Sequence, residues 1–174
     1  MSFHAAVFIA ISLDGYIARP DGSIDWLTER GDQAGDTGYD EFMASIDTVV
    51  MGRNTFEKVL GFGFWPYDGK HVEVLSTTLD PDVDERVIVH RTLDSLVETL
   101  ADRGAQRIYA DGGKLIQTFL RAGLLNELTI TTAPVLIGSG LRLFGDLDQD
   151  ITLVHNATRT LKAGFVQSDY TVVR

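Results

Sequence analysis

Short runs of β-branched, aromatic and other apolar residues recur along the chain, separated by polar turns or by segments with helical periodicity. The first run, AAVFIAISL at residues 5–13, ends at Asp14-Gly15 and predicts a buried strand followed by a turn. Similar runs predict further strands at residues 48–51, 72–76, 86–90, 107–110 and 128–137, the last broken at Pro134.

Apolar residues three and four positions apart predict helices between several of these strands. The clearest pattern covers residues 113–121, with Gly123 as a plausible stop. Its apolar stripe consists of Leu115, Ile116, Phe119 and Leu120. Another helix is predicted after residue 92, and either Thr92 or Asp94 can cap it.

Three shorter segments complete the first half of the chain. Residues 18–38 contain glycine, aspartate and proline without sustained periodicity, so a long loop is expected there. Residues 39–45 predict a short helix. A further helix is predicted to end at Leu60, with Asn54 or Thr55 as its cap.

The end of the chain predicts a β-hairpin, formed by residues 151–161 and 165–174 and joined at Lys162-Ala163-Gly164. Strands that alternate with helices and are followed by a strand pair predict an α/β fold. The expected architecture is a central, mostly parallel mixed sheet with helices on both faces and a C-terminal antiparallel hairpin. A chain of 174 residues suits one domain of this kind.

Composition narrows the possible partners. The formal net charge of −10 repels nucleic acid phosphates and anionic lipids, so we expect neither nucleic acid nor a membrane as a partner. There is no cysteine and the four histidines lie far apart, so no metal site is expected. The first apolar run, of about nine residues, has no basic segment before it and is too short to span a bilayer. We therefore expect a cytoplasmic protein.

Two strand-to-helix junctions lack bulky side chains where a ligand would approach the sheet. At VVMGRNT, Gly52 allows close approach of the backbone and Arg53 offers a planar set of donors for a phosphate. Asn54 and Thr55 add donors beside the positive end of the helix. The alternative is that Gly52 only makes a tight turn and Arg53 is a solvated surface residue.

At the second junction, IYADGGK, Gly112-Gly113-Lys114 opens another helix, and here a turn followed by a surface lysine is the alternative. The chain contains neither GxGxxG nor GxxxxGK[ST], so the usual dinucleotide fingerprint and the P-loop are both missing. Two separate glycine-opened helices suggest a dinucleotide that is held at two places.

Five segments, in order, are IAISLDGYIA, VVMGRNTFE, VEVLSTT, YADGGKLIQTFL and ELTITTAPVLIGSGLRLF. Together they resemble the dihydrofolate reductase-like superfamily, and SLDGYIA and APVLIGSG favour its riboflavin-biosynthesis reductase branch over true dihydrofolate reductases. The resemblance covers nearly the whole chain. It implies one three-layer α/β domain over residues 1–174, dependence on NADPH, and a homodimer.

The resemblance also implies which residues bind NADPH. The residues that flank the nicotinamide are Ala10 and Ile17. Two sets hold the pyrophosphate. The first, Gly52, Arg53, Asn54 and Thr55, also helps to bind the 2′-phosphate. The second is Gly112, Gly113, Lys114 and Leu115. Those near the adenosine ribose and 2′-phosphate are Ser76 and Thr77. Without the resemblance, simple strand termination would explain Ser76 and Thr77.

The substrate-binding candidates are Trp26, Asp40, Phe42 and Trp65. The resemblance implies Trp26 and a helix carboxylate, whereas Trp65 is a candidate because aromatic residues are enriched in substrate pockets. A helix carboxylate is expected to bind the substrate, and Asp36, Asp40 and Glu41 are alternatives for it. Trp65 belongs to an aromatic loop that could instead cover a sheet edge or form a dimer contact.

The expected reaction is transfer of a hydride from C4 of NADPH to a C=N bond of a small heterocycle. In the riboflavin branch the substrate is 5-amino-6-(5-phosphoribosylamino)uracil. Catalytic candidates are Asp14, Asp25 and Thr131, although water could also donate the proton and Thr131 could be a locally satisfied strand residue. Possible donors to a substrate phosphate are Arg19, Lys70 and Arg142. The alternatives are a dihydrofolate reductase or a non-catalytic nucleotide-binding homodimer.

Overall fold

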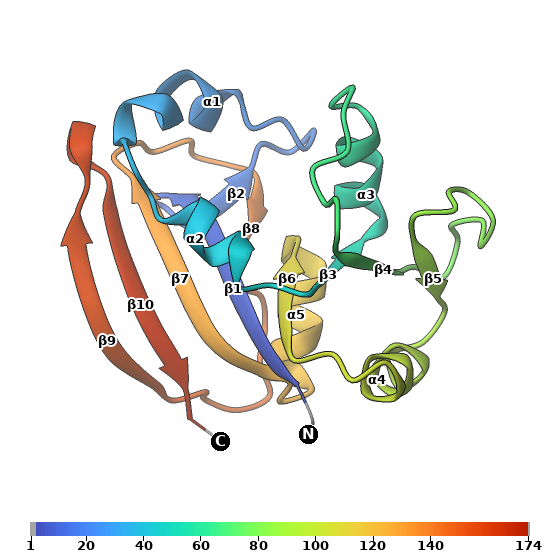
Figure 1. Ribbon diagram of the computed structural model, residues 1–174. Helices are drawn as coiled ribbons and strands as arrows, with labels where there is room; N and C mark the ends of the chain where they lie inside the picture. The colour runs from blue at the N-terminus through green and yellow to red at the C-terminus, as the bar shows by residue number, and fades with distance from the viewer. Residues whose placement is uncertain (1–2, 174) are drawn as a thin grey trace.

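The computed structural model describes residues 3–173, which form a large sheet and a small one (Figure 1). The large sheet has eight strands in the order β5-β4-β3-β6-β1-β7-β10-β9. In that order they span Ile88–His90, His71–Leu75, Thr48–Gly52, Arg107–Asp111, His4–Ser12, Leu125–Ala133, Val166–Val172 and Leu153–Thr160. The small sheet pairs β2 (Tyr16–Ala18) with β8 (Leu141–Arg142).

Neighbouring strands are parallel from β5 to β7, whereas β10 is antiparallel to both β7 and β9. This pattern confirms the predicted mostly parallel sheet with a C-terminal antiparallel hairpin. The hairpin turns through a short 3-10 helix, Lys162–Gly164, in which Ala163 has φ 56°. Arg174, which the predicted hairpin included, lies outside the described residues.

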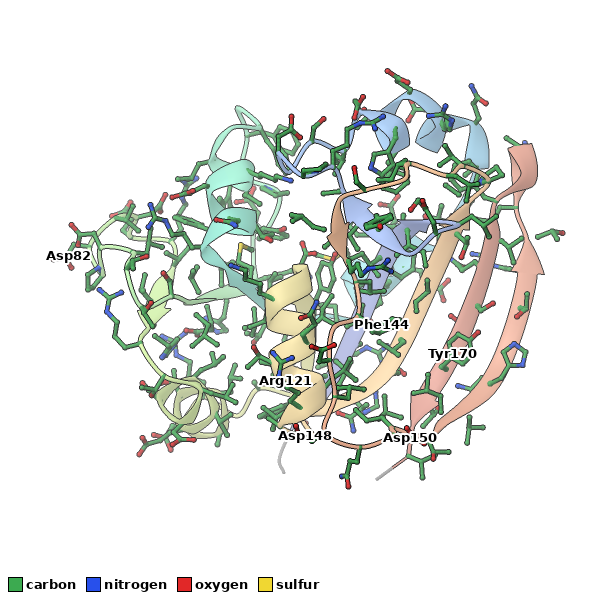
Figure 2. All side chains as sticks on the ribbon, turned by 180° about the vertical axis from the view of Figure 1, so that it is seen from behind. Asp82, Arg121, Phe144, Asp148, Asp150 and Tyr170 are labelled. Carbon is green, nitrogen blue, oxygen red and sulfur yellow. The ribbon has the colours of Figure 1, made fainter. Side chains whose placement is uncertain are left out.

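The helices cover the two faces of the sheet. On one face, α4 (Leu93–Asp102) and α5 (Gly113–Arg121) pack against β1, β6 and β7. The four stripe residues predicted for residues 113–121 are all buried there. On the other face, α2 (Tyr39–Ala44) and α3 (Arg53–Leu60) pack against residues of β3 and β4 such as Met51 and Val74. Figure 2 shows the α5 face from behind, with Arg121 near the end of α5.

Three predictions about local structure were wrong. The predicted loop at residues 18–38 contains α1 (Asp25–Gly31) and a 3-10 helix, Asp32–Ala34. α1 is short and has no side-chain cap hydrogen bond, so its stability comes from burial of Trp26 rather than from a local signal. The strand predicted at residues 128–137 is β7, which starts at Leu125 and ends at Ala133, so residues 135–137 do not continue it. The predicted break at Pro134 is confirmed, because proline cannot donate to a sheet.

The third wrong prediction concerns the start of α3. Neither Asn54 nor Thr55 caps this helix, since it begins at Arg53 and Gly52 occupies the cap position without a side-chain hydrogen bond. By contrast, Thr92 caps α4 as expected and accepts a hydrogen bond from the Ser95 N–H. No helix in residues 3–173 combines the length and the apolar character needed to cross a membrane.

Candidate active site

The two glycine junctions lie side by side at the carboxyl ends of β3 and β6. These strands are parallel neighbours, and Met51 pairs with Asp111 at the end of their register. α3 then packs on one face of the sheet and α5 on the other. Ligands of α/β proteins bind at such a switch point, where adjacent strands send their helices to opposite faces. We call the carboxyl ends of β3 and β6 the switch point below.

Gly112 and Gly113 touch neighbouring segments so closely that a side chain would not fit. Gly112 has φ +99°, and a Cβ atom there would lie 2.6 Å from Thr55 Oγ1 on α3. A Cβ atom on Gly113 would lie 2.8 Å from Ile17 Cδ1 and 3.2 Å from the Arg142 carbonyl oxygen. The structure therefore brings Ile17, Thr55 and the Gly112-Gly113 pair together.

Gly52 differs, because it faces open space. Its φ is −86°, and no atom outside its own chain neighbours lies within 4 Å of a Cβ atom built there. α3 and α5 both start without a side-chain cap hydrogen bond. Their first-turn N–H groups are thus left to water or to a bound anion, which the positive end of a helix attracts.

Two arginines reach the turn that follows β4. Arg53 donates from Nη1 to Thr78 Oγ1 at 2.8 Å, and Arg91 donates from Nη1 to the Ser76 carbonyl oxygen at 2.8 Å. Both arginines are exposed. The Ser76 hydroxyl is buried and accepts from the N–H groups of Thr78 and Leu79, at 3.2 and 3.1 Å, whereas Thr77 is exposed. The sequence had not singled out Arg91, although it follows β5 much as Arg53 follows β3.

The remaining cofactor candidates lie on β1 and on the first turn of α5. Ala10 of β1 pairs in register with Thr131 of β7, and the Thr131 hydroxyl accepts from Gln167 Nε2 at 2.9 Å. Lys114 is exposed, whereas the Leu115 side chain is buried in the core. Leu115 can therefore serve a ligand only through its backbone.

Asp111 is a carboxylate at the switch point that the sequence had not singled out. It is the last residue of β6 and is partly exposed. Burial of the carboxyl group raises its pKa to about 6, and hydrogen bonding to the Gly112 N–H and to Tyr109 and the charge of Lys58 offset only part of that rise. A group poised near neutral pH is suited to proton transfer. Its position directly before Gly-Gly was the available sequence signal.

The two predicted catalytic aspartates are engaged elsewhere. Asp14 accepts from Ser12 Oγ at 2.6 Å and from the N–H groups of Gly138 and Ile137, at 2.8 and 3.3 Å. The hydrogen bond from Ser12, followed by the backbone bonds, lowers the pKa of Asp14. The ion pair with Arg19, at 2.6 Å, likewise lowers the pKa of Asp25. These contacts favour structural roles, because both carboxylates stay ionised near neutral pH.

The proposed donors to a substrate phosphate are also occupied. Arg19 is held by Asp25. Lys70 donates to the carbonyl oxygens of Met43 and Ile46, at 2.7 Å each, and so closes the end of α2. Arg142 lies over the Tyr16 ring, with its guanidinium carbon 4.8 Å from the ring centre.

A groove of about 380 Å³ lies between α2 and the strands β1, β7 and β10. Phe8 and Phe42 line it, with ring centres 5.0 Å apart. Its polar lining includes Thr129, Gln167 and Asp169. Phe42 therefore lies where a planar substrate could pack, whereas Thr131 lies beside the groove and contacts Gln167.

The other substrate candidates lie outside this groove. Trp26 is fully buried among Ala34, Ala133 and Phe165, and its indole N–H has no hydrogen-bond partner among the described residues. The Asp40 side chain is exposed on α2. Trp65 packs under Arg86, at 4.1 Å, and lines a separate cavity of about 180 Å³ beside α3. The structure thus brings Phe42 to the groove but not Trp26, Asp40 or Trp65.

Residues 4–167 match the family model described as the RibD C-terminal domain. The chain belongs to the RibD C-terminal domain family. This match includes both glycine junctions and confirms the predicted riboflavin-biosynthesis branch. A crystal structure from Shewanella sp. PV-4, provisionally named a riboflavin biosynthesis protein, is 37% identical to this RibD-family chain. It covers 99% of this chain and 100% of its own, with a TM-score of 0.89.

Two more distant structures show the fold that the RibD family shares. One is a diaminohydroxyphosphoribosylaminopyrimidine deaminase/5-amino-6-(5-phosphoribosylamino)uracil reductase from Thermotoga maritima, with 16% identity and a TM-score of 0.74 over 98% of this chain and 57% of that one. The other is dihydrofolate reductase from Enterococcus faecalis complexed with NADP(H), with 17% identity and a TM-score of 0.65 over 99% and 98%. The fold is therefore dihydrofolate reductase-like, as predicted.

Proposed function

We propose that this protein is an NADPH-dependent reductase of a small nitrogen heterocycle, similar to 5-amino-6-(5-phosphoribosylamino)uracil reductase. The observation that carries the proposal is the meeting of two uncapped helix N-termini at the switch point, in contact through Gly112 and Thr55. The reductase activity in the name of the Thermotoga protein and the NADP(H) bound to the Enterococcus enzyme support it.

The residues at the switch point fit a phosphorylated dinucleotide. The open space above Gly52 leaves room for a pyrophosphate beside the free N–H groups of α3 and α5. Arg53 and Arg91 converge on the turn at Ser76 and Thr78, where a 2′-phosphate would meet two guanidinium groups. This pair of cations is the feature that favours NADPH over NADH.

Reduction of a C=N bond consumes one hydride and one proton. NADPH, when bound, supplies the hydride from C4 of its nicotinamide. The Asp111 carboxyl group, with a pKa of about 6, is partly protonated near neutral pH and can hold the proton for the substrate nitrogen. Asp111 shares the α2 face of the sheet with Tyr109, whose hydroxyl donates to the Phe8 carbonyl oxygen at 3.2 Å. The proton would therefore be held at the switch point, on the face of the sheet that also carries the groove.

Cofactor binding is tested by measuring the affinities of NADPH and NADH for the wild type, Arg53→Ala and Arg91→Ala. We expect each substitution to weaken NADPH binding by about 10- to 100-fold, the size of one charge-assisted contact, and to change NADH binding much less. Arg121→Ala is the matched control, since Arg121 is exposed at the far end of α5 (Figure 2). Equal losses of affinity for NADPH and NADH would show that the arginines do not contact the 2′-phosphate. Failure of the wild type to bind NADPH would overturn the proposal.

The substrate is tested by following NADPH consumption with 5-amino-6-(5-phosphoribosylamino)uracil and with dihydrofolate. Turnover of the pyrimidine supports the proposed reaction. Turnover of dihydrofolate that methotrexate inhibits would instead assign a dihydrofolate reductase. Tight NADPH binding without reduction of either compound would favour a non-catalytic nucleotide-binding protein.

A further inference from the structure

The floor of the groove, formed by Phe8, Thr129 and Asp169, lies two residues along the strands from Ala10, where the nicotinamide is expected. In the register of β1, β7 and β10, Thr131 lies between Ala10 and Gln167, and Thr129 lies between Phe8 and Asp169. Residues two apart on a strand share a face and are about 7 Å apart. A planar molecule on the row formed by Phe8, Thr129 and Asp169 would therefore lie next to a nicotinamide at Ala10.

Asp169 offers a free hydrogen-bond acceptor on this floor. It is partly buried, and its Oδ1 accepts from Thr129 Oγ1 at 2.8 Å, which fixes the orientation of the carboxylate. Within residues 3–173 no other hydrogen bond or ion pair engages the side chain, so Oδ2 can accept from a ligand. Of the predicted substrate carboxylates, Asp36 precedes α2 and its Oδ1 already accepts from the Gly38 N–H at 2.8 Å, and Asp40 is exposed on α2 outside the groove. Glu41 of α2 does line the groove, but its side chain is exposed and no hydrogen bond to the described residues fixes its orientation.

Arg159 offers free donors beside this acceptor. Its Nε donates to Gln167 Oε1 at 2.9 Å, and its terminal Nη groups make no hydrogen bond to any of the described residues. Gln167 is buried and spends its own Nε2 on the Thr37 carbonyl oxygen and Thr131 Oγ1, at 2.9 Å each. Both N–H donors of the Gln167 amide are thus used, and its oxygen orients Arg159. The groove therefore presents a fixed acceptor and a fixed donor near one another.

The walls of the groove suit a flat ring. Phe8 and Phe42 form one side, and the Arg107 guanidinium carbon lies 6.0 Å from the centre of the Phe42 ring. Arg107 is already paired with Glu127, so its charge is compensated. Pockets of this kind bind planar ligands through stacking and select them with a few polar groups.

We infer that the groove recognises the lactam edge of a planar heterocycle, in which a ring N–H adjoins a carbonyl group. Asp169 Oδ2 accepts the ring N–H, and an Arg159 Nη group donates to the neighbouring carbonyl oxygen. This inference rests on the proposed function and deepens it, because it assigns substrate selection to the terminal hairpin rather than to α2. Thr129 and Gln167 are positioning residues, since they act through Asp169 and Arg159.

The test uses two probes, 6-aminouracil and 6-amino-1,3-dimethyluracil, which share both carbonyl groups but differ in the ring N–H groups. Their dissociation constants are measured by ligand-observed NMR with the full chain, with and without NADPH. The wild type should bind 6-aminouracil about 10- to 100-fold more tightly than the dimethyl compound. In Asp169→Asn this preference should fall about tenfold or more, because the acceptor of the ring N–H is lost. In Arg159→Gln the affinity for both probes should fall about tenfold and the preference should remain, because both probes keep the carbonyl groups. The affinity for NADPH should stay unchanged in both variants.

Asp148→Asn is the matched control, because Asp148 is an exposed aspartate that Figure 2 shows below Arg121, near the end of α5. Equal affinity of the wild type for the two probes, or binding of neither up to the solubility limit, would overturn the inference. So would an unchanged preference in Asp169→Asn. Failure of NADPH to bind the wild type is a separate result that overturns the proposed function, whatever the two probes do.

Discussion

The β3–α3 and β6–α5 junctions look alike in the sequence, but they need glycine for different reasons. Gly112 has φ +99° and lies against Thr55, so the packing of the protein itself excludes a side chain there. Gly52 has φ −86°, which any residue can adopt, and faces open space. The fold therefore requires Gly112, whereas Gly52 is required only where a bound molecule occupies that space. Stability and ligand affinity, measured separately, distinguish these two reasons.

The two junctions also differ in the charged residue that each carries. Asp111 ends β6 as a partly buried acid, and burial of its carboxyl group raises its pKa to about 6. Arg53 begins α3 as an exposed cation that pairs with Glu57 at 2.7 Å and needs no burial. A desolvated acid is suited to proton transfer, and an exposed arginine is suited to capture of an anion from water. Under the proposed function both junctions bind the pyrophosphate, and only the β6–α5 junction adds a group that can hold a proton.

Gly112→Ala should have the largest effect, because it breaks the junction that the fold requires. A positive φ and a contact of 2.6 Å with Thr55 Oγ1 should together lower the free energy of unfolding by about 2–5 kcal/mol. Urea denaturation without cofactor measures this loss. Gly104→Ala is the control, since Gly104 has φ +67° but no neighbour within 4 Å of a Cβ atom, and it should cost only about 1 kcal/mol. Equal losses in the two variants would show that the contact with Thr55 contributes nothing.

Local patterns in the sequence predicted most of the elements around these junctions. The stripe of α5 has the helical period, and the Lys162-Ala163-Gly164 turn separates two extended runs, so both elements were predicted correctly. α1 was missed because it is short, uncapped and held by Trp26. Its stability depends on contacts with Ala133 and Phe165, which lie far along the chain.

The site was less predictable than the fold, because its residues meet through strand order. Nothing local places β6 between β3 and β1, so the contact of Gly112 with Thr55 could not be derived from spacing. Arg91 looked like a residue before a helix cap, and only the pairing of β4 with β5 brings it to Ser76. Asp169 looked like one polar position of an alternating strand. Its role as a groove acceptor depends on the antiparallel pairing of β10 with β7.

Asp111→Asn tests the acid of the β6–α5 junction, because it removes the carboxyl group whose pKa is raised. In the folded protein the pKa of Asp111 is about 6, above the ordinary value of 3.8, so the native state binds the proton more tightly than the unfolded state does. The free energy of unfolding of the wild type therefore falls as pH rises from about 4 to 6, and above that range the contribution of Asp111 stays constant. The variant lacks this cost and should be more stable than the wild type by about 1–3 kcal/mol at pH 7.5, and equally stable near pH 4.

Denaturation curves at pH 4, 5, 6 and 7.5 measure the Asp111 effect. Asp82→Asn serves as the control, since Asp82 is an exposed aspartate far from the switch point (Figure 2) and should show no such trend. A stability difference for Asp111→Asn that does not change with pH would mean that the carboxyl group titrates normally in the folded protein. In that case its suitability as a proton donor near neutral pH would be lost.

Gly52→Ala should have the smallest effect on the folded protein and so gives the sharpest test of the junction that faces open space. Because its φ is ordinary and no atom is within reach, the free energy of unfolding without cofactor should change by at most about 1 kcal/mol, the size of a helix-cap preference. NADPH affinity should nevertheless fall about tenfold, because the new methyl group occupies the space proposed for the pyrophosphate. Denaturation and NADPH titration of the same preparation separate the two effects. A stability loss as large as that of Gly112→Ala, or unchanged NADPH affinity, would mean that Gly52 is not kept small for a ligand.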